Sequence, residues 1–208
     1  MKRVLMILAN GIEPLEVAAF TDILGWADLI GDEPVKLTHA GLRHGITTTF
    51  GLKVSIDTLL SELNLDEYDA LALPGGFGPA GFYDESLSEP YLRAIRHFDA
   101  AGKIIASVCV SSISLGMAGI LVGRNATVYH KVGGMRKQQL TDTGANFVDK
   151  PVVIDGNIIT STGPGTAAEV AFWLLARLTS PENSLNIRQG MRFDLPGKAW
   201  LETPQVEE

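Results

Sequence analysis

The sequence predicts an α/β fold in which helices cover both faces of a mostly parallel, doubly wound sheet. Short, continuously apolar segments alternate with longer amphipathic ones, which is the pattern of consecutive strand–helix–strand units. The apolar segments stop at turns that contain glycine, as buried strands do before the chain crosses to a helix. Because the 208 residues contain no internal repeat, low-complexity tract or linker, we expect a single domain.

The sheet is expected to begin with the first residues of the chain. Residues 4–9 are all apolar and stop at Asn10-Gly11, which predicts a strand buried on both faces. Residues 15–30 carry apolar side chains at every third or fourth position and end at Gly31, which predicts an amphipathic helix. The side chains expected to form its buried face are Leu15, Ala18, Ala19, Ile23, Trp26 and Leu29.

Further strands are predicted before the middle of the chain. Residues 35–40 predict a second strand of the sheet, and residues 46–56, which Gly51 divides, predict a hairpin. Residues 69–73 form another apolar segment. This segment runs into the turn Pro74-Gly75-Gly76, whose backbone amides can face a ligand.

A strand becomes a helix at the single cysteine. Residues 91–101 predict a crossover helix that Gly102 closes. Residues 103–108 predict the next strand, and Cys109 follows without an intervening loop. The small and apolar residues 110–120 then predict a helix that begins at once.

The last part of the chain completes the domain, which we place at residues 1–180. Short strands are predicted at residues 126–129, 152–154 and 158–161. Residues 167–178 predict a strongly apolar helix. Residues 181–208 are expected to form an irregular, polar C-terminal extension that frays or packs on a partner.

The composition argues against several functional classes. With 24 Asp and Glu against 17 Lys and Arg the formal net charge is −7, so nucleic acid is not an expected partner. The apolar segments are far shorter than the roughly 20 residues that cross a bilayer, and no signal peptide is apparent, so we expect a cytoplasmic protein without a membrane partner. The single cysteine and the spacing of the four histidines predict no metal site.

The candidate chemistry lies where the strands end. In an open parallel sheet, ligands bind beyond the carboxyl ends of the strands, which here brings together residues 10–16, residues 74–78 and Cys109. A sharp strand-to-helix turn would hold the sulfur of Cys109 away from the backbone, and the start of the next helix would favour its thiolate. Free cysteine is also among the most buried residue types, so a purely structural Cys109 remains an equal alternative from its position alone.

Other groups could assist the sulfur. The backbone amides of Gly76 and Val110 could stabilise an oxyanion, although a glycine turn after a strand is also common without function. Glu16 could share protons with the sulfur, or it could, like Glu13, only complement the positive end of the helix. His130 follows a short predicted strand and could return to the edge that carries the cysteine. The histidines expected at or near the surface are His39, His44 and His97.

Taken together, these motifs resemble those of the ThiJ/PfpI superfamily. The resemblance covers about residues 3–180 and is carried by the ordered set of residues 7–16, residues 73–76, Cys109, His130 and residues 160–166. It implies a flavodoxin-like fold related to the class I glutamine amidotransferases, no cofactor, and a homodimer. It also implies a role for each candidate residue. Cys109 matches the elbow cysteine, Glu16 its adjacent acid and His130 a nearby histidine, and the oxyanion pocket corresponds to Gly75, Gly76 and Val110.

The resemblance implies a cysteine-dependent enzyme that acts on reactive carbonyls in the manner of a glyoxalase or deglycase, with a small electrophile as its partner. Isonitrile hydration is a second enzymatic alternative, and a redox-sensing or chaperone-like stress-response protein is the non-enzymatic one. Val110 stands where PfpI peptidase-like members carry a histidine, so proteolysis by a Cys–His pair is not expected. Thr162 stands where one branch carries an arginine, which removes an anion-binding group.

Overall fold

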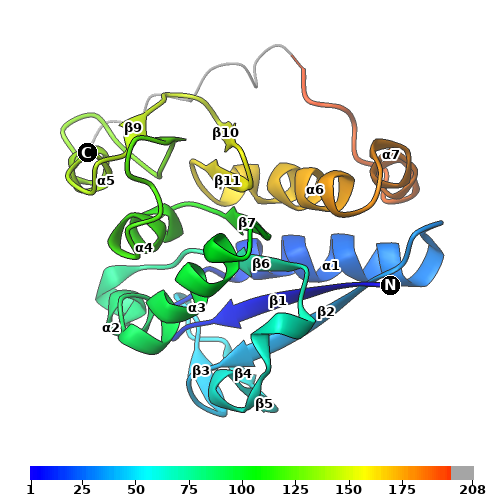
Figure 1. The fold of residues 1–208 in the computed structure, drawn as a ribbon, viewed down its shortest axis with the longest axis horizontal. Coiled ribbons are helices and arrows are strands. Elements are labelled where there is room, and N and C mark those ends of the chain that lie inside the picture. The colour runs from blue at the N-terminus through cyan, green and yellow to red at the C-terminus, as the bar shows by residue number, and fades with distance from the viewer. Residues whose placement is uncertain (198–208) are drawn as a thin grey trace.

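The computed structural model describes residues 1–197 and contains a seven-stranded sheet between two layers of helices (Figure 1). The strand order is β10-β11-β7-β6-β1-β2-β5, and all neighbouring strands are parallel except β10 and β11. The strands are β1 (Lys2–Leu8), β2 (Val35–Gly41), β5 (Thr58–Leu59), β6 (Ala70–Leu73), β7 (Ile104–Ser107), β10 (Val152–Asp155) and β11 (Ile158–Ser161). This arrangement confirms the predicted flavodoxin-like, doubly wound sheet.

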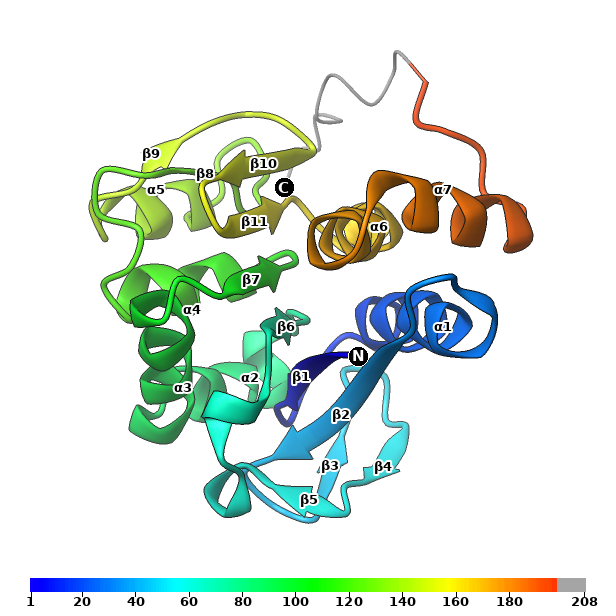
Figure 2. The same ribbon diagram turned by 45° about the vertical axis from the view of Figure 1, so that its right-hand side comes forward.

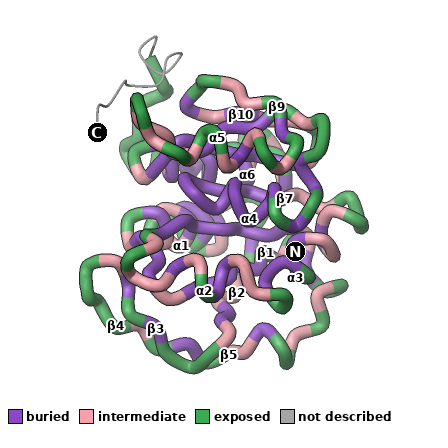
Figure 3. Tube along the Cα trace, turned by 90° about the vertical axis from the view of Figure 1, so that its left-hand side faces the viewer, coloured by how far each residue is buried: buried purple, intermediate pink, exposed green. Residues whose placement is uncertain are grey.

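The two helical layers are separated by the sheet (Figure 2). One layer consists of α1 (Pro14–Ile30), α6 (Ala167–Leu178) and α7 (Pro181–Gly190). The other consists of α2 (Phe82–Ser86), α3 (Glu89–Ala100) and α4 (Ser111–Met117). Because helices cover both faces, β1 is buried from Val4 to Leu8 and needs no polar alternation, which is why its sequence is continuously apolar (Figure 3).

Smaller elements lie outside the main sheet. The predicted hairpin is confirmed as β3 (Gly45–Thr47) and β4 (Lys53–Ser55). The strand expected at residues 126–129 is shorter than predicted, because only β8 (Asn125–Ala126) is regular, and it pairs with β9 (Asn146–Phe147) rather than with the main sheet. The remaining helix is α5 (Arg136–Thr141). Single 3₁₀ turns lie at Leu60–Glu62, Leu65–Glu67, Gly78–Ala80 and Pro164–Thr166.

The buried face of α1 differs from the prediction. Of the six side chains expected to be buried, only Ile23 is, whereas Trp26 is 40% exposed and Leu29 is 80% exposed. The buried stripe is instead Glu16, Phe20, Ile23, Leu24 and Ala27. Apolar residues occur on several sides of this helix, so their spacing fits two registers. The observed register turns the carboxyl group of Glu16 inward, as its proposed proton-sharing role requires.

The expectation of an irregular tail after Pro181 is wrong for residues 181–190, which form α7. Ser180 caps this helix by accepting a hydrogen bond from the amide of Asn183 at 3.2 Å, and Pro181 occupies the first turn. The helix contacts α1 and α6, and its buried residues are Ile187 and the polar Asn183, Ser184 and Arg188, so hydrophobic periodicity did not indicate it. The part of the extension at residues 198–208 lies outside the described residues, and its packing on a partner stays a prediction.

Candidate active site

Cys109 lies on a strained turn between β7 and α4. Its φ angle is +60°, a conformation that side chains with a Cβ rarely adopt. Its amide donates to the carbonyl oxygen of Ser161 at 3.0 Å, and the hydroxyl of Ser111 donates to the carbonyl oxygen of Pro74 at 2.7 Å. These bonds hold the turn from two neighbouring strand ends. The predicted sharp strand-to-helix turn is therefore present at Cys109.

The turn after β1 and the turn after β6 are joined beside the cysteine. The amide of Glu13 donates to the carbonyl oxygen of Gly75 at 2.8 Å, and the amide of Phe77 donates to that of Gly11 at 3.0 Å. These bonds flank Gly76, whose own amide has no hydrogen-bond partner among residues 1–197. The strand order reverses between β1 and β6, which is where ligands bind in open α/β sheets.

Glu16 is completely buried beside the sulfur. Its Oε2 accepts a hydrogen bond from the amide of Gly75 at 2.5 Å. Its Oε1 has no hydrogen bond of good geometry among residues 1–197, and the carboxyl group lies against the thiol of Cys109. The structure thus brings together the cysteine and the acid that were predicted to adjoin.

The protonation of this pair differs from the prediction of a thiol ionised by the helix terminus. Burial raises the pKa of Glu16 to about 8, although the hydrogen bond from Gly75 opposes the shift. Burial and the neighbouring carboxylate raise the pKa of Cys109 well above its ordinary value, against the opposing effect of the Val110 amide. Cys109 is only 4% exposed, and the seven-residue helix α4 does not offset the loss of hydration that this burial causes. The two groups therefore titrate as a coupled pair.

A cavity of about 330 Å³ opens onto Cys109. Its lining comprises Glu13, Phe50, Gly76, Phe77, Gly78, Pro79, Cys109, Val110, Tyr129, Arg136 and Pro164. Of the predicted oxyanion residues, Gly76 and Val110 line the cavity, and Gly75 lies behind them against the cysteine, where a Cβ would come within 2.9 Å of that of Cys109. Aromatic rings and prolines form much of the rest, so a small organic molecule would be held in largely apolar surroundings.

Two residues of this cavity with acidic or basic side chains, Glu13 and Arg136, are not among the site residues predicted from the sequence. Glu13 is buried, and burial raises the pKa of its carboxyl group. The sequence predicts for it only the role of complementing the positive end of the helix, and the hydrogen bond from its amide to Gly75 is what brings it to the cavity. Arg136 starts α5, after a loop whose course no periodicity predicts. No sequence signal pointed to it.

The side-chain contacts of His130 are with residues other than Cys109. Its Nδ1 is 2.8 Å from the carbonyl oxygen of Val128, and its Nε2 is 3.2 Å from a carboxylate oxygen of Asp149. The ring also packs edge-on against Phe147, and it does not line the cavity at Cys109. None of these contacts is with Cys109, although the amide of the adjacent Tyr129 donates to the carbonyl oxygen of Cys109 at 3.4 Å, so a pairing of His130 with the cysteine stays a prediction.

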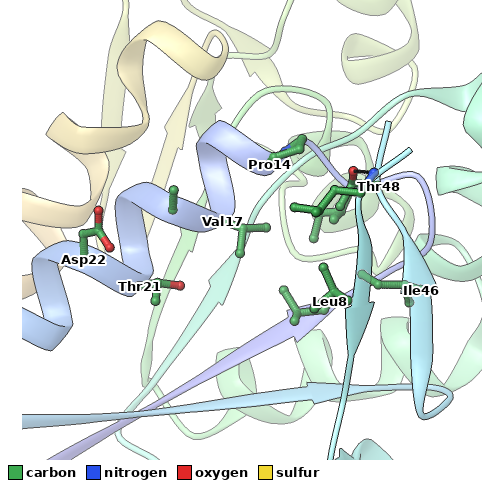
Figure 4. A pocket seen from close by; sticks show the side chains of 11 residues that line it. Leu8, Pro14, Val17, Thr21, Asp22, Ile46 and Thr48 are labelled. Atoms are coloured by element: carbon green, nitrogen blue, oxygen red, sulfur yellow. Dashed lines mark hydrogen bonds between the residues drawn. The ribbon is translucent and has the colours of Figure 1, made fainter. Parts of the chain in front are cut away.

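A second cavity of about 280 Å³ lies between α1 and the β3–β4 hairpin (Figure 4). Its lining is mostly apolar, with Leu8, Val17 and Ile46 among the side chains that point into it. It contains no cysteine or histidine, so the cavity at Cys109 is the stronger candidate for catalysis. Among residues 1–197, no cluster of three or more His, Cys, Asp or Glu side chains could hold a metal ion, and no helix is long and apolar enough to span a membrane.

The fold and the site define a flavodoxin-like α/β protein whose cysteine stands on a strand-to-helix elbow beside a buried acid. Residues 2–177 match the family model described as the DJ-1/PfpI family. The chain belongs to this family, which confirms the resemblance found in the sequence.

Several relatives and solved structures are similar over most of the chain. Protein dj-1beta of Drosophila melanogaster is 34% identical over 192 residues, which cover 91% of this chain and 96% of the relative. Its crystal structure has a TM-score of 0.81 and covers 93% of this chain and 99% of its own, at 31% identity. Deglycase TK1284 of Thermococcus kodakarensis is 32% identical over 78% of this chain and 91% of its own. Protein DJ-1 homolog A of Arabidopsis thaliana is 34% identical, but the match covers only 44% of its length.

Proposed function

We propose that the chain is a cofactor-independent enzyme in which Cys109 adds to the aldehyde of a small 2-oxoaldehyde. The observation that carries the proposal is the contact between a strained, buried cysteine and the buried carboxyl group of Glu16 at a cavity of about 330 Å³. The names of relatives such as Deglycase TK1284 support a reactive-carbonyl substrate. The substrate is a small carbonyl compound because the cavity accommodates little more.

The first step is addition of sulfur to the aldehyde carbon. Glu16 and Cys109 exchange protons as a coupled pair, and the reactive form is the minor one in which Glu16 carries the proton and Cys109 is the thiolate. The sulfur lone pair forms the C–S bond while the carbonyl π pair moves to oxygen. The amides of Gly76 and Val110 stabilise this oxyanion, and Glu16 then protonates it, which gives a hemithioacetal.

The second step moves hydrogen between the two carbons. The carboxylate of Glu13 removes the hydrogen on the former aldehyde carbon, and the released pair forms a carbon–carbon double bond as the ketone oxygen becomes an enediolate. The hydroxyl proton passes between the two oxygens, and Glu13 returns its proton to the former ketone carbon. The product of this step is a thioester. Water then attacks the thioester carbon, the C–S bond breaks, Glu16 regains a proton, and a 2-hydroxy acid leaves.

We assign the second step to Glu13 rather than to His130 because Glu13 lines the cavity and both ring nitrogens of His130 have other partners. The test is formation of lactate from methylglyoxal by the purified chain, compared with Cys109→Ser and Glu16→Gln. Loss of activity in Cys109→Ser is expected. Equal activity of Cys109→Ser and the parent would overturn the proposal, and a parallel assay with an alkyl isonitrile tests the alternative hydration.

A redox-sensing role is the second candidate, and a specific observation favours it. Glu16 is a buried acid whose protonated form can donate a hydrogen bond to an oxidised sulfur. Two equivalents of hydrogen peroxide would convert the thiol to a sulfinate with release of two waters. Intact-mass analysis after mild peroxide should then show two added oxygens confined to Cys109. Oxidation of exposed methionines before Cys109 would count against this role.

We also propose that two copies of the chain form a homodimer. The apolar side chains of Leu15, Trp26 and Leu29 on α1 are exposed in the single chain, and association of two copies through this helix would bury them. Sedimentation should give a dimer for the parent chain and a shift toward monomer for Trp26→Glu. A monomeric parent at micromolar concentration would contradict the proposal.

A further inference from the structure

Arg136 is the one cationic residue among the side chains that line the cavity at Cys109. It begins α5, whereas the cysteine lies at the end of β7 and Glu13 lies between β1 and α1. The cation therefore reaches the cavity from a segment that contributes nothing to the acid–cysteine pair. A group placed in this way can bind a part of the substrate other than the reacting carbonyl.

The guanidinium of Arg136 has no anionic partner among the described residues. Its one hydrogen bond is from Nη1 to Oε1 of Gln139, a neutral acceptor, at 2.7 Å. Several other arginines are paired with carboxylates, as Arg43 is with Glu85 and Arg188 is with Glu169. Because a guanidinium has five N–H donors, most of the donors of Arg136 remain available.

The position of Arg136 is fixed by stacking. Its Cζ lies 4.9 Å from the centroid of the Tyr83 ring, and Tyr83 is close enough to Cys109 for the two side chains to interact electrostatically. A stacked guanidinium loses less conformational freedom when a ligand binds. The apolar rings and prolines around it weaken screening, so an anion that enters the cavity would interact strongly with the cation.

We infer that Arg136 selects substrates that carry a carboxylate at the end remote from the reacting carbonyl. The inference rests on the proposed function and specifies its substrate class as a 2-oxoaldehyde with an anionic tail. A planar carboxylate can accept two parallel N–H bonds from a guanidinium, which orients the molecule so that its aldehyde end faces the sulfur. Thr162, the position at which one branch of the family carries an arginine, does not line this cavity. The cation that lines it is Arg136, from α5.

Two substrates of equal length test the inference. The anionic one is 4,5-dioxopentanoate, and the uncharged one is 2-oxopentanal. Initial rates are measured for the parent chain, Arg136→Gln and Lys137→Gln. Lys137 is the matched control because it is an exposed cation one residue away on α5 that does not line the cavity.

For 4,5-dioxopentanoate, Arg136→Gln should lower kcat/KM by roughly 10- to 100-fold, mainly through KM, as expected for loss of a charge-assisted hydrogen bond. For 2-oxopentanal the same variant should change kcat/KM less than about threefold. Lys137→Gln should change kcat/KM less than about threefold for both substrates. Equal losses on the two substrates, or no loss on either, would overturn the inference.

A binding measurement separates this outcome from failure of the proposed function. The corresponding products, 2-hydroxyglutarate and 2-hydroxypentanoate, differ only in the remote carboxylate and bind without turnover. Calorimetry should show tighter binding of 2-hydroxyglutarate by the parent chain, with the difference absent in Arg136→Gln. If the parent consumes neither aldehyde but shows this difference, the proposed reaction is wrong and the anion site stands. If the parent binds both acids equally, the anion site is wrong.

Discussion

The amide of Gly75 donates a hydrogen bond of 2.5 Å to Oε2 of Glu16, across 59 residues of sequence. The bond joins the turn after β6 to the first turn of α1. It fixes the position of the Glu16 carboxyl group relative to Cys109. Gly75 also packs directly on Cys109, because a Cβ at this position would lie 2.9 Å from the Cβ of Cys109 and 2.9 Å from the carbonyl oxygen of Val108. One glycine thus positions both members of the reactive pair.

Gly75→Ala should therefore displace the cysteine elbow. The added methyl group meets backbone and a side-chain stem that cannot rotate away, so we expect destabilisation of about 1–3 kcal/mol and a loss of thiol reactivity. Urea unfolding and the rate of alkylation by iodoacetamide measure the two effects. Gly25→Ala is the control, because nothing lies within 4 Å of a Cβ there and the helix interior should gain up to about 1 kcal/mol. Similar responses of the two variants would contradict the argument.

Glu16→Gln should stabilise the fold, and the gain should depend on pH. Burial raises the pKa of Glu16 from 4.5 to about 8, so the folded chain keeps this proton over a range in which the unfolded chain has released it. The stability contributed by the protonated acid is therefore complete below pH 4.5 and is lost as the pH rises toward 8. At pH 7 the loss is about 3 kcal/mol, from 1.36 kcal/mol per pH unit.

Glutamine keeps an oxygen for the Gly75 amide but has no proton to lose. Its gain in unfolding free energy should be up to about 3 kcal/mol at pH 7 and near zero at pH 4.5. Urea unfolding at the two pH values measures it. A gain of the same size at both would show that packing, and not ionisation of Glu16, is responsible.

The central sheet could be predicted because each buried strand is recognisable from its own short stretch of sequence. Parallel strands covered on both faces need uninterrupted apolar residues, as in residues 70–73, and their ends must meet at one edge of the sheet. That convergence alone placed Glu16, Gly76 and Cys109 together. The face of α1 could not be predicted in this way, because apolar side chains surround the helix and only the packed sheet selects which of them are buried.

The rest of the site depends on longer-range structure. Arg136 follows an irregular loop, so no spacing rule predicts that it lines the cavity at Cys109. The position of His130, about twenty residues after the cysteine in the sequence, suggested that the two residues form a pair. In the structure, the ring nitrogens of His130 contact Val128 and Asp149. The raised pKa values of Glu16 and Cys109 depend on burial, which sequence position does not determine.

Glu169→Gln should destabilise the chain through α7. Both carboxylate oxygens of Glu169 accept bonds from Nη2 of Arg188, at 2.6 and 2.7 Å, and the guanidinium also stacks on Phe172. Arg188 is buried, so removing the carboxylate leaves a buried cation unpaired, at about 3 kcal/mol. Glu89→Gln is the control, because its pair with Arg96 is exposed and should contribute less than about 1 kcal/mol. Thermal and urea unfolding compare them, and equal effects would argue that α7 adds little to the fold.

Alkylation of Cys109 should follow a two-step pH profile. The thiol and Glu16 are buried together, so the pair loses its first proton near pH 8 and its second only at higher pH, where two negative charges must coexist. In Glu16→Gln the second charge cannot form, and the rate should rise in a single step at a lower pH than the last step of the parent. Cys109 is the chain's single cysteine, so iodoacetamide incorporation followed by mass reports this site alone, with Cys109→Ser as the blank. Superimposable single-step profiles for the parent and Glu16→Gln would mean that the carboxyl group and the sulfur do not share protons.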